Sequence, residues 1–289
     1  MMLNDVRPEG HGEEGPEEIM QSAAPTEAQR IALSGRRVSK TFRTKDGENH
    51  ALGPIDFDIK EGEFVSIIGA SGCGKSTTML ITAGLMPATS GEIHFRGQRL
   101  HSPLTDVGIV FQDHLLLDFR TALDNVMLQQ QIRRLDRNAA LERARELFAK
   151  LNLTGAENRY PSQLSGGMRQ RVSIARALVH EPSILMMDEP FGALDAITRN
   201  QIRYDLELLW METKKTVIFI THSIEEAIGL SDRVLVMSNS PGTIIDEIHV
   251  DLPRPRPVHL GEYPEFTKYA NRVFDIFEKI GVYRFGRRN

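Results

Sequence analysis

The 289-residue chain has little cysteine and no long apolar run. Its single cysteine, Cys73, cannot form an internal disulfide, which fits a reducing compartment. No stretch approaches the roughly 20 apolar residues that a membrane span requires, and the start of the chain lacks the apolar core of a secretory signal. We therefore expect a soluble chain that reaches a membrane only through a partner.

An excess of positive charge is also missing. The formal net charge is -4 and no long basic stripe occurs, so a nucleic-acid partner is not expected. An apolar content of 40% and a charged content of 26% are ordinary for a globular protein, and the length allows a sizeable core. These features exclude a membrane-spanning protein and disfavour a nucleic-acid binder.

The chain divides by composition into three parts. Residues 1–32 carry seven acidic and two basic side chains, which predicts a disordered acidic tail. Residues 33–253 form the main domain, and apolar residues at helical spacing within 113–165 predict a helical insert. Short apolar runs predict buried strands of a parallel sheet at 64–68, 107–111, 184–187 and 217–220, with candidate edge strands at 233–237 and 243–250.

The last part, residues 254–289, begins in a proline-rich stretch. Pro253, Pro255 and Pro257 interrupt regular structure, so the main domain is expected to end there. An amphipathic helix is predicted between Tyr263 and Gly281, and we expect its apolar face to pack on its own domain. That face comprises Phe266, Tyr269, Val273, Phe274 and Phe277.

A glycine-rich segment between an expected strand and an expected helix at 76–85 fits the pattern G-x-x-x-x-G-K-[ST]. Glycines let successive backbone N–H groups point at phosphate oxygens, and the following helix start favours an anion. Lys75 would reach the β- and γ-phosphates, and Ser76 would offer its hydroxyl to Mg²⁺. The predicted nucleotide-binding residues are Gly69, Ala70, Ser71, Gly72, Cys73, Gly74, Lys75, Ser76 and Thr77.

Two further strands end in polar residues. The strand at 184–187 runs into Asp188 and Glu189, and buried carboxylates need a cation or water as partner. Asp188 would hold Mg²⁺, and Glu189 would act as general base toward the attacking water. His222 follows the strand at 217–220 and would hydrogen-bond the γ-phosphate, with a capping box from Ser223 fixing the next helix. In isolation, the two carboxylates could equally mark an ordinary strand end, and a lone histidine is more often structural.

A second candidate phosphate-binding element is the string Leu-Ser-Gly-Gly-Met at 164–168, directly before a helix expected at 169–178. Ser165 offers a hydroxyl, while Gly166 and Gly167 open the backbone at a helix start. Serine and glycine are also common helix caps, so the string alone leaves both interpretations open.

Together, these motifs in this order resemble those of the ATP-binding subunits of ABC transporters over about residues 34–253. The resemblance implies an α/β phosphate-loop NTPase core with an antiparallel β edge sheet and an inserted α-helical subdomain. It also implies a homodimer in which Ser165, Gly166 and Gly167 complete the ATP site of the opposite subunit. By the same resemblance, Gln112 contacts Mg²⁺ and water, Phe42 stacks on adenine and Asp195 links the two sites. Phe42 could instead belong to the core, and Ser223 departs from the aspartate usual in the family.

Finer similarity points to one group within that family. The strings at 111–119, 190–195 and 237–242 resemble those of importer ATPases for nitrate, sulfonate, taurine and bicarbonate. This implies an ATP hydrolase at the cytoplasmic face of the cell membrane, with separate permease subunits and, indirectly, a solute-binding protein. The alternative is a soluble ABC-type ATPase acting on DNA or ribosomes, although neither a second ATPase unit nor a long coiled-coil insert is visible. A small-molecule kinase would not explain the string at 164–168, and no guanine-reading Asn-Lys-x-Asp string supports a GTPase.

Overall fold

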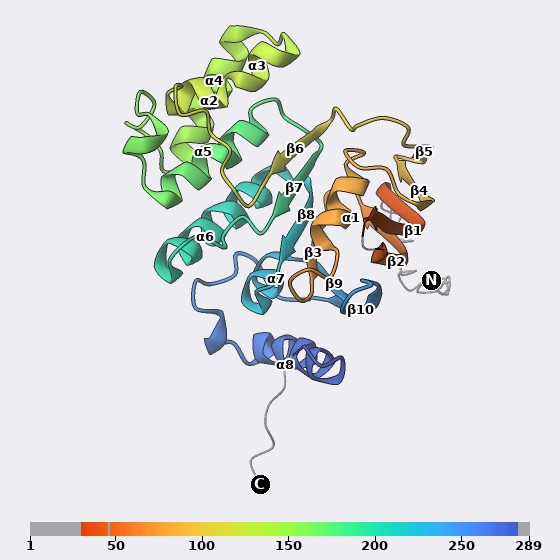
Figure 1. Cartoon of the computed structure of the whole chain (residues 1–289). Helices are drawn as coiled ribbons and strands as arrows, with labels where there is room; N and C mark the ends of the chain where they lie inside the picture. The colour runs from red at the N-terminus through yellow and green to blue at the C-terminus, as the bar shows by residue number, and fades with distance from the viewer. Residues whose placement is uncertain (1–29, 46, 283–289) are drawn as a thin grey trace, which may run out of the picture.

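The computed structural model describes residues 30–45 and 47–282, so the predicted acidic tail lies almost wholly outside it. Its centre is a six-stranded sheet in which five strands run parallel and β10 runs antiparallel at one edge (Figure 1). In spatial order the strands are β10 (Ile244–His249), β9 (Arg233–Met237), β3 (Phe64–Ile68), β8 (Thr216–Thr221), β7 (Ile184–Asp188) and β6 (Val107–Val110).

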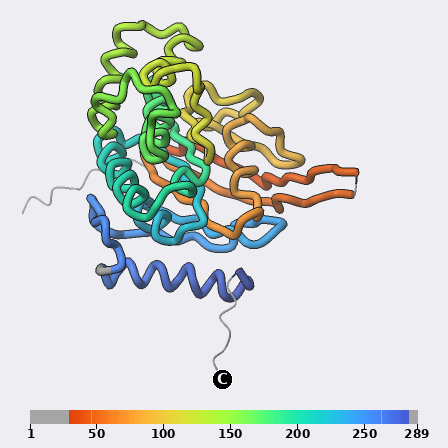
Figure 2. The backbone as a smooth tube through the Cα atoms, turned by 60° about the vertical axis from the view of Figure 1, so that its left-hand side comes forward, coloured from red at the N-terminus to blue at the C-terminus, as the bar shows by residue number. Residues whose placement is uncertain are grey.

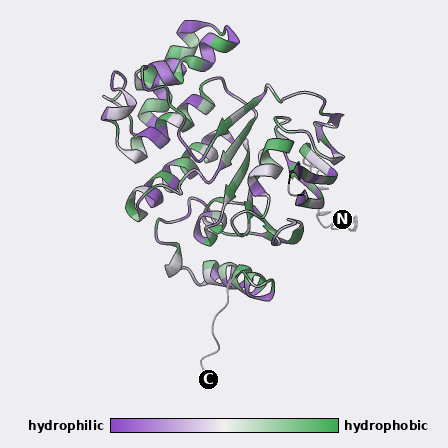
Figure 3. Cartoon of the chain, in the orientation of Figure 1, coloured by the Kyte–Doolittle hydropathy of each residue, from purple (hydrophilic) through white to green (hydrophobic). Residues whose placement is uncertain are grey.

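Both faces of the five parallel strands are buried, which explains why these strands are almost continuously apolar. Val65 and Ile67 of β3 pack in a cluster with Met79 of α1 (Lys75–Thr82). Leu185 and Met187 of β7 point to the opposite cluster, which holds residues of α5 (Gly166–Leu178) and α6 (Ala196–Thr213). Figure 1 shows α5 and α6 on one side of the central strands and α1 on the other, and Figure 3 shows those strands in the hydrophobic colour.

A second, antiparallel sheet has the strand order β2-β1-β4-β5. Its strands are β1 (Ile31–Thr44), β2 (Gly47–Lys60), β4 (Ser90–Phe95) and β5 (Gln98–Arg99). The long hairpin of β1 and β2 extends away from the rest of the molecule (Figure 2). Leu33, Val38 and Ile55 from this sheet join the cluster around α1, so the sheet covers that side of the central strands.

The helical insert lies between β6 and α5. It contains α2 (Ala122–Val126), α3 (Leu128–Arg133), α4 (Arg137–Lys150) and the 3₁₀ turn η1 (Pro161–Gln163). Asn125 is fully buried and holds the preceding loop: its Nδ2 donates to the carbonyls of Leu117, Arg120 and Thr121. Because that loop continues directly from Gln112, the insert is fastened to the segment that leaves β6.

The C-terminal part is anchored to the main domain by buried charge. After β10, Arg254 donates to Glu207 of α6 and Asp232, while the fully buried Arg256 donates to the carbonyls of Ile228 and Ser231. The proline-rich stretch therefore lies against α6 and α7 (Ile224–Leu230).

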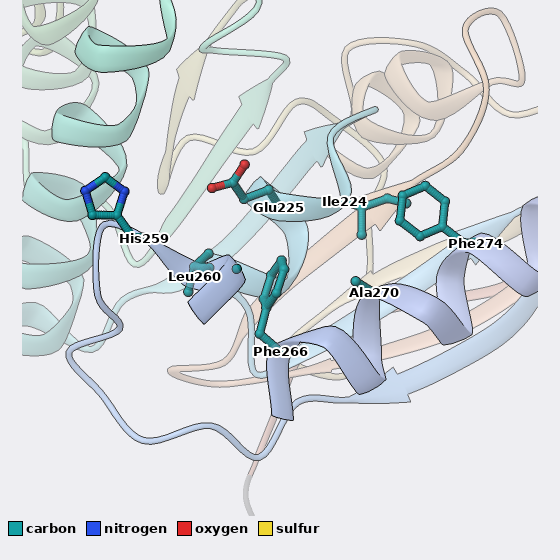
Figure 4. Close-up of a pocket in the computed structure, with 8 residues that line it drawn as sticks. Ile224, Glu225, His259, Leu260, Phe266, Ala270 and Phe274 are labelled. Atoms are coloured by element: carbon teal, nitrogen blue, oxygen red, sulfur yellow. The ribbon is translucent and has the colours of Figure 1, made fainter. Parts of the chain in front are cut away.

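The final helix, α8 (Pro264–Lys279), follows the 3₁₀ turn η2 (Leu260–Glu262) and packs on its own domain as expected. Phe266, Val273 and Phe277 are buried with residues of α7, β9 and β10, whereas Phe274 is 38% exposed. A cleft of about 400 Å³ opens between α7 and α8, and its lining includes Ile224, Leu260 and Phe274 (Figure 4). No residue of the phosphate loop lines this cleft.

Several predicted boundaries need correction. The strand Arg233–Met237 is not an edge, because it pairs with β3 on one side and β10 on the other. The helix after the phosphate loop ends at Thr82 rather than residue 85, because Gly84 takes a positive φ of 72°. The helix expected at 169–178 already begins at Gly166, because Ser165 caps it. Among the described residues, no helix is long and apolar enough to cross a membrane.

Candidate nucleotide-binding and hydrolytic site

The phosphate loop leaves the buried strand β3 and ends at the start of α1. Gly72 and Gly74 have positive φ values of 77° and 104°, a conformation that favours glycine. A Cβ on Gly74 would lie 2.7 Å from the carbonyl oxygen of Ala51, so neither the backbone conformation nor the space admits a larger residue. The predicted loop is thus a tight turn whose backbone opens toward a helix N-terminus.

Lys75 places its ammonium group inside this turn. Its Nζ donates to the carbonyls of Gly69 at 3.0 Å and Ala70 at 2.9 Å, and the residue is only 4% exposed. The same Nζ lies 3.6 Å from Oε1 of Glu189. The cation is therefore held between the phosphate loop and the end of β7.

Asp188 and Ser76 meet at the mouth of the loop. Ser76 Oγ donates to Asp188 Oδ1 at 3.0 Å. Burial raises the pKa of Asp188, and the hydrogen bond from Ser76 opposes this shift. A hydroxyl and a half-buried carboxylate at this position are oxygen ligands of the kind Mg²⁺ prefers.

Glu189 sits at the centre of the polar cluster. Its Oε2 is 2.9 Å from His222 Nδ1, and its Oε1 faces Lys75. The backbone of Glu189 has a φ of 43°, a left-handed conformation that is unfavourable for a non-glycine residue. Its N–H donates to the carbonyl of Ile220 in β8, which holds the carboxylate beside His222 at the tips of adjacent strands. The structure thus brings together two of the three predicted catalytic residues.

Gln112 is exposed just beyond β6. Its Nε2 lies 3.8 Å from the position that a Cβ on Gly192 would take. Gly192 closes a turn with Glu189, since its N–H donates to the Glu189 carbonyl at 3.2 Å. Gln112 is therefore adjacent to the Glu189 turn, with its side chain reaching the edge of the cluster.

Ser165, Gly166, Gly167 and Asp195 gather at two neighbouring helix starts. Ser165 Oγ caps α5 by accepting from the Met168 N–H, and Asp195 Oδ1 caps α6 by accepting from the Thr198 N–H. Hydrogen bonds from the backbone and the side chain of Thr198 lower the pKa of the exposed Asp195. A Cβ on Gly167 would lie 2.5 Å from Thr198 Cγ2, so the two helix starts are in close contact. The described part of the chain has no hydrogen bond between Ser165 or Asp195 and the phosphate loop.

Phe42 lies in β1, where it pairs with Asn49 and is half-buried. The ammonium of Lys40 lies 5.2 Å from the centroid of its ring. Its ring is thus accessible on the protruding hairpin, and it belongs to neither of the clusters described above.

Gly242 and Ala51 support the phosphate loop, and neither role was identified from the sequence. Gly242 packs so closely that a Cβ would lie 1.9 Å from the carbonyl oxygen of Cys73. The Gly242 N–H donates to the carbonyl of Ala51 in β2 at 3.2 Å. A Pro-Gly pair after an apolar strand signals a turn, but nothing in the sequence says which loop this turn contacts.

A strand–glycine loop–helix unit with a buried lysine, facing two carboxylates at the end of a neighbouring parallel strand, defines a phosphate-loop NTPase. The family model described as ABC transporter matches residues 52–192. The chain is also 40% identical over 252 residues to an aliphatic sulfonates import ATP-binding protein of Bacillus cereus, covering 87% of this chain and 98% of that protein. It therefore belongs to the ABC transporter ATP-binding proteins and is an ATPase.

Other relatives are similar. A nitrate import ATP-binding protein of Synechococcus elongatus is 40% identical, with 81% of this chain and 85% of that protein covered. A taurine import ATP-binding protein of Rhizobium johnstonii is 47% identical, with 71% and 78% covered. The dimeric structure of the bacterial ABC transporter cassette MJ0796 matches with a TM-score of 0.68 and 34% identity, covering 76% of this chain and all of that one. A post-hydrolysis dimer of the same cassette, bound to ADP and Pi, matches with a TM-score of 0.66, 33% identity and the same coverage.

Proposed function

We propose that two copies of this chain bind two ATP molecules between them and that hydrolysis drives solute import through separate permease subunits. The observation that carries this proposal is the division of the predicted ATP contacts within one chain. Lys75, Ser76 and Asp188 form one cluster, whereas Ser165 and Asp195 stand at exposed helix starts elsewhere. A head-to-tail dimer gives each phosphate loop the Ser165 helix start of the other copy.

Within each site we assign Lys75 to the β- and γ-phosphates and Glu189 to the attacking water as general base. His222 would hold the γ-phosphate, while its Nδ1 is paired with Glu189. Phe42 on the protruding hairpin would stack on adenine, and Asp195 would contact the opposite copy.

Mg²⁺ would be held by Ser76 and Asp188, with Gln112 at its edge. The described residues contain no group of three or more His, Cys, Asp or Glu side chains that could hold a metal ion. This fits Mg²⁺, which usually takes one or two protein ligands and completes its shell with phosphate oxygens and water. The ion would neutralise phosphate charge in the reaction.

The transported solute is proposed from the relatives. Their names give aliphatic sulfonates, nitrate and taurine as imported compounds. We infer that this chain energises uptake of a small anion or zwitterion of that kind, as a peripheral subunit at the cytoplasmic face of the membrane. A solute-binding protein would act indirectly by delivering the solute to the permease. Co-purification with a permease supports this assignment, and co-purification with ribosomes or DNA instead contradicts it.

The decisive variant is Glu189→Gln. It retains a side chain of the same size but removes the base, so hydrolysis should fall by about two to four orders of magnitude while ATP binding persists. With MgATP the variant should accumulate as a dimer, measured by light scattering, because the bridging γ-phosphate is not removed. Turnover at the rate of the unmodified chain would remove the role given to Glu189, and a variant that stays monomeric would contradict the shared site.

A further inference from the structure

Glu226 is a buried carboxylate beside the hydrolytic cluster that the roles above do not use. It lies in the first turn of α7 and is only 6% exposed. Its Oε2 accepts from Thr221 Oγ1 at 2.5 Å, and the same hydroxyl accepts from the Ser223 N–H at 2.9 Å. Since Thr221 and Ser223 flank His222, Glu226 holds both ends of the turn that presents His222. The capping box predicted from the sequence is therefore only half formed, because the Glu226 side chain engages Thr221.

Arg199 reaches from α6 toward the same carboxylate. Its Nη2 donates to the carbonyl of Leu194 at 2.8 Å, directly before Asp195. Its Nε lies 3.7 Å from Glu226 Oε1. Arg199 and Glu226 therefore connect the His222 turn with the Asp195 turn inside one chain.

The contact between Arg199 and Glu226 is not a hydrogen bond in this structure. A distance of 3.7 Å is within reach of an ion pair but too long for a hydrogen bond, and Arg199 Nε is a buried atom with no hydrogen-bond partner among the described residues. A buried donor without an acceptor is unfavourable. A movement of less than about 1 Å would let Arg199 Nε donate to Glu226, and the new hydrogen bond would stabilise that second arrangement. The contact can therefore take two arrangements, one with and one without this hydrogen bond. Coupling between two sites requires such a two-state element, whose equilibrium both sites can shift.

We propose that Arg199 and Glu226 are positioning residues that couple the His222 turn of one ATP site to the Asp195 turn facing the other. This inference rests on the proposed dimer, in which His222 contacts the γ-phosphate and Asp195 contacts the opposite copy. Contact of His222 with γ-phosphate draws the His222 turn inward, closes the contact between Glu226 and Arg199, and moves the Leu194 carbonyl together with Asp195. Each site thereby responds to the nucleotide in the other.

The test compares Arg199→Gln, Glu226→Gln and the double variant in the full chain. Glu226→Gln keeps an oxygen that accepts from Thr221 but loses the charge facing Arg199. We expect each single variant to lower the Hill coefficient for ATP toward one and to reduce turnover about 2- to 30-fold. The double variant should lose no more than either single variant, because both remove the same contact.

A matched pair tests the other end of the connection. Thr221→Val removes the hydroxyl that Glu226 accepts from and preserves the shape of the side chain, whereas Thr221→Ser keeps the hydroxyl. We expect the valine variant to reproduce the loss of cooperativity and the serine variant to behave like the unmodified chain. Unfolding temperature and the affinity of the monomer for a fluorescent ATP analogue are measured for every variant.

The outcomes separate the two proposals. If Glu189→Gln never dimerises with MgATP, the proposed function fails and the coupling fails with it. If it dimerises but the Arg199 and Glu226 variants keep the Hill coefficient of the unmodified chain, or that coefficient is already one, only the coupling is overturned. The coupling is also overturned if the loss of turnover in the double variant equals the product of the two single losses. It is likewise overturned if the variants lower only the unfolding temperature and the nucleotide affinity.

Discussion

At the scale of the residue, Cys73 reports on the phosphate loop. The residue is 1% exposed, and burial raises the pKa of its thiol above the ordinary value of 9.0, with Lys75 opposing the shift. Only the thiolate reacts with alkylating agents, so a raised pKa makes the reactive fraction small at neutral pH. We expect alkylation to accelerate by about tenfold per pH unit from pH 7 to 9, and MgATP to protect the thiol.

Mass spectrometry of chain treated with iodoacetamide, with and without MgATP, measures this protection. The variant Cys73→Ser serves as the unlabelled control, since the chain has no other cysteine. Equal labelling with and without nucleotide would contradict the placement of Cys73 inside the ATP-binding loop.

The two glycines at the start of α5 should differ in their tolerance of a side chain. A Cβ on Gly167 would lie 2.5 Å from Thr198 Cγ2, whereas one on Gly166 would approach no atom closer than 3.7 Å. We expect Gly167→Ala to destabilise the nucleotide-free chain by about 1–3 kcal/mol through overpacking. Gly166→Ala should change stability by no more than about 0.5 kcal/mol.

Denaturant unfolding measures both effects. Adding Thr198→Ser to Gly167→Ala removes the clashing methyl group and should restore most of the lost stability. A Gly167→Ala chain as stable as the unmodified one would show that the starts of α5 and α6 are not in this close contact.

At the scale of the element, α6 offers a comparison between a buried and an exposed ion pair. Glu207 is fully buried and accepts from Arg254 Nη1 at 2.9 Å, whereas Glu212 is 55% exposed where it pairs with Lys150. Glu207→Ala leaves the buried Arg256 N–H without its acceptor and leaves Arg254 paired with Asp232, so it should destabilise the chain by about 2–4 kcal/mol. Glu212→Ala should cost no more than about 1 kcal/mol, because water replaces its partner.

Equilibrium unfolding of the two variants gives the comparison directly. Because Arg254 anchors the C-terminal part to α6, the Glu207→Ala chain should also lose protection from hydrogen exchange in α8 at lower denaturant. Equal stabilities for the two variants would mean that Glu207 does not hold this part of the chain.

The sequence predicted the boundaries of some strands but not their order in the sheet. Buried strands such as Phe64–Ile68 and Arg233–Met237 were placed to the residue, because a short apolar run between turn residues leaves little choice. The position of Arg233–Met237 within the sheet was wrong, since strand order depends on long-range pairing that periodicity does not encode. The 14-residue strands β1 and β2 were not located, because their exposed ends are polar and β1 contains several register shifts.

The site was predictable where a local motif carries its chemistry. The glycine pattern placed Lys75 and Ser76 from the residues alone, while Phe42, Gln112 and Asp195 came only from family resemblance. Arg199 was missed, and Glu226 was assigned only to the capping box with Ser223, because their relation appears only when α6 and α7 pack together.

At the scale of the whole molecule, the proposed ATP contacts divide into two half-sites. One contains Lys75 and Glu189, and the other contains Ser165 at the start of α5. In a head-to-tail dimer with two-fold symmetry, each complete site takes one half from each copy. In the proposed dimer, nucleotide occupancy and dimer closure are one event, so removing the γ-phosphate would let the copies separate.

Mixing two defective chains tests this arrangement. Lys75→Ala disables the phosphate loop, and Ser165→Arg blocks the α5 half-site with a bulky side chain, so each variant alone should hydrolyse almost no ATP. A mixed dimer pairs the intact phosphate loop of one variant with the intact Ser165 helix start of the other, which restores one complete site. In an equal mixture half of the dimers are mixed, so activity should recover to about a quarter of the unmodified level if the sites act independently. If Arg199 and Glu226 couple the sites, the single complete site lacks the contribution of the other site and the recovery should stay below that level. Because the coupling is then already lost, substituting Arg199 in both chains should not lower the recovery further. If mixing restores no activity while light scattering shows that mixed dimers form, each chain must build its ATP site alone.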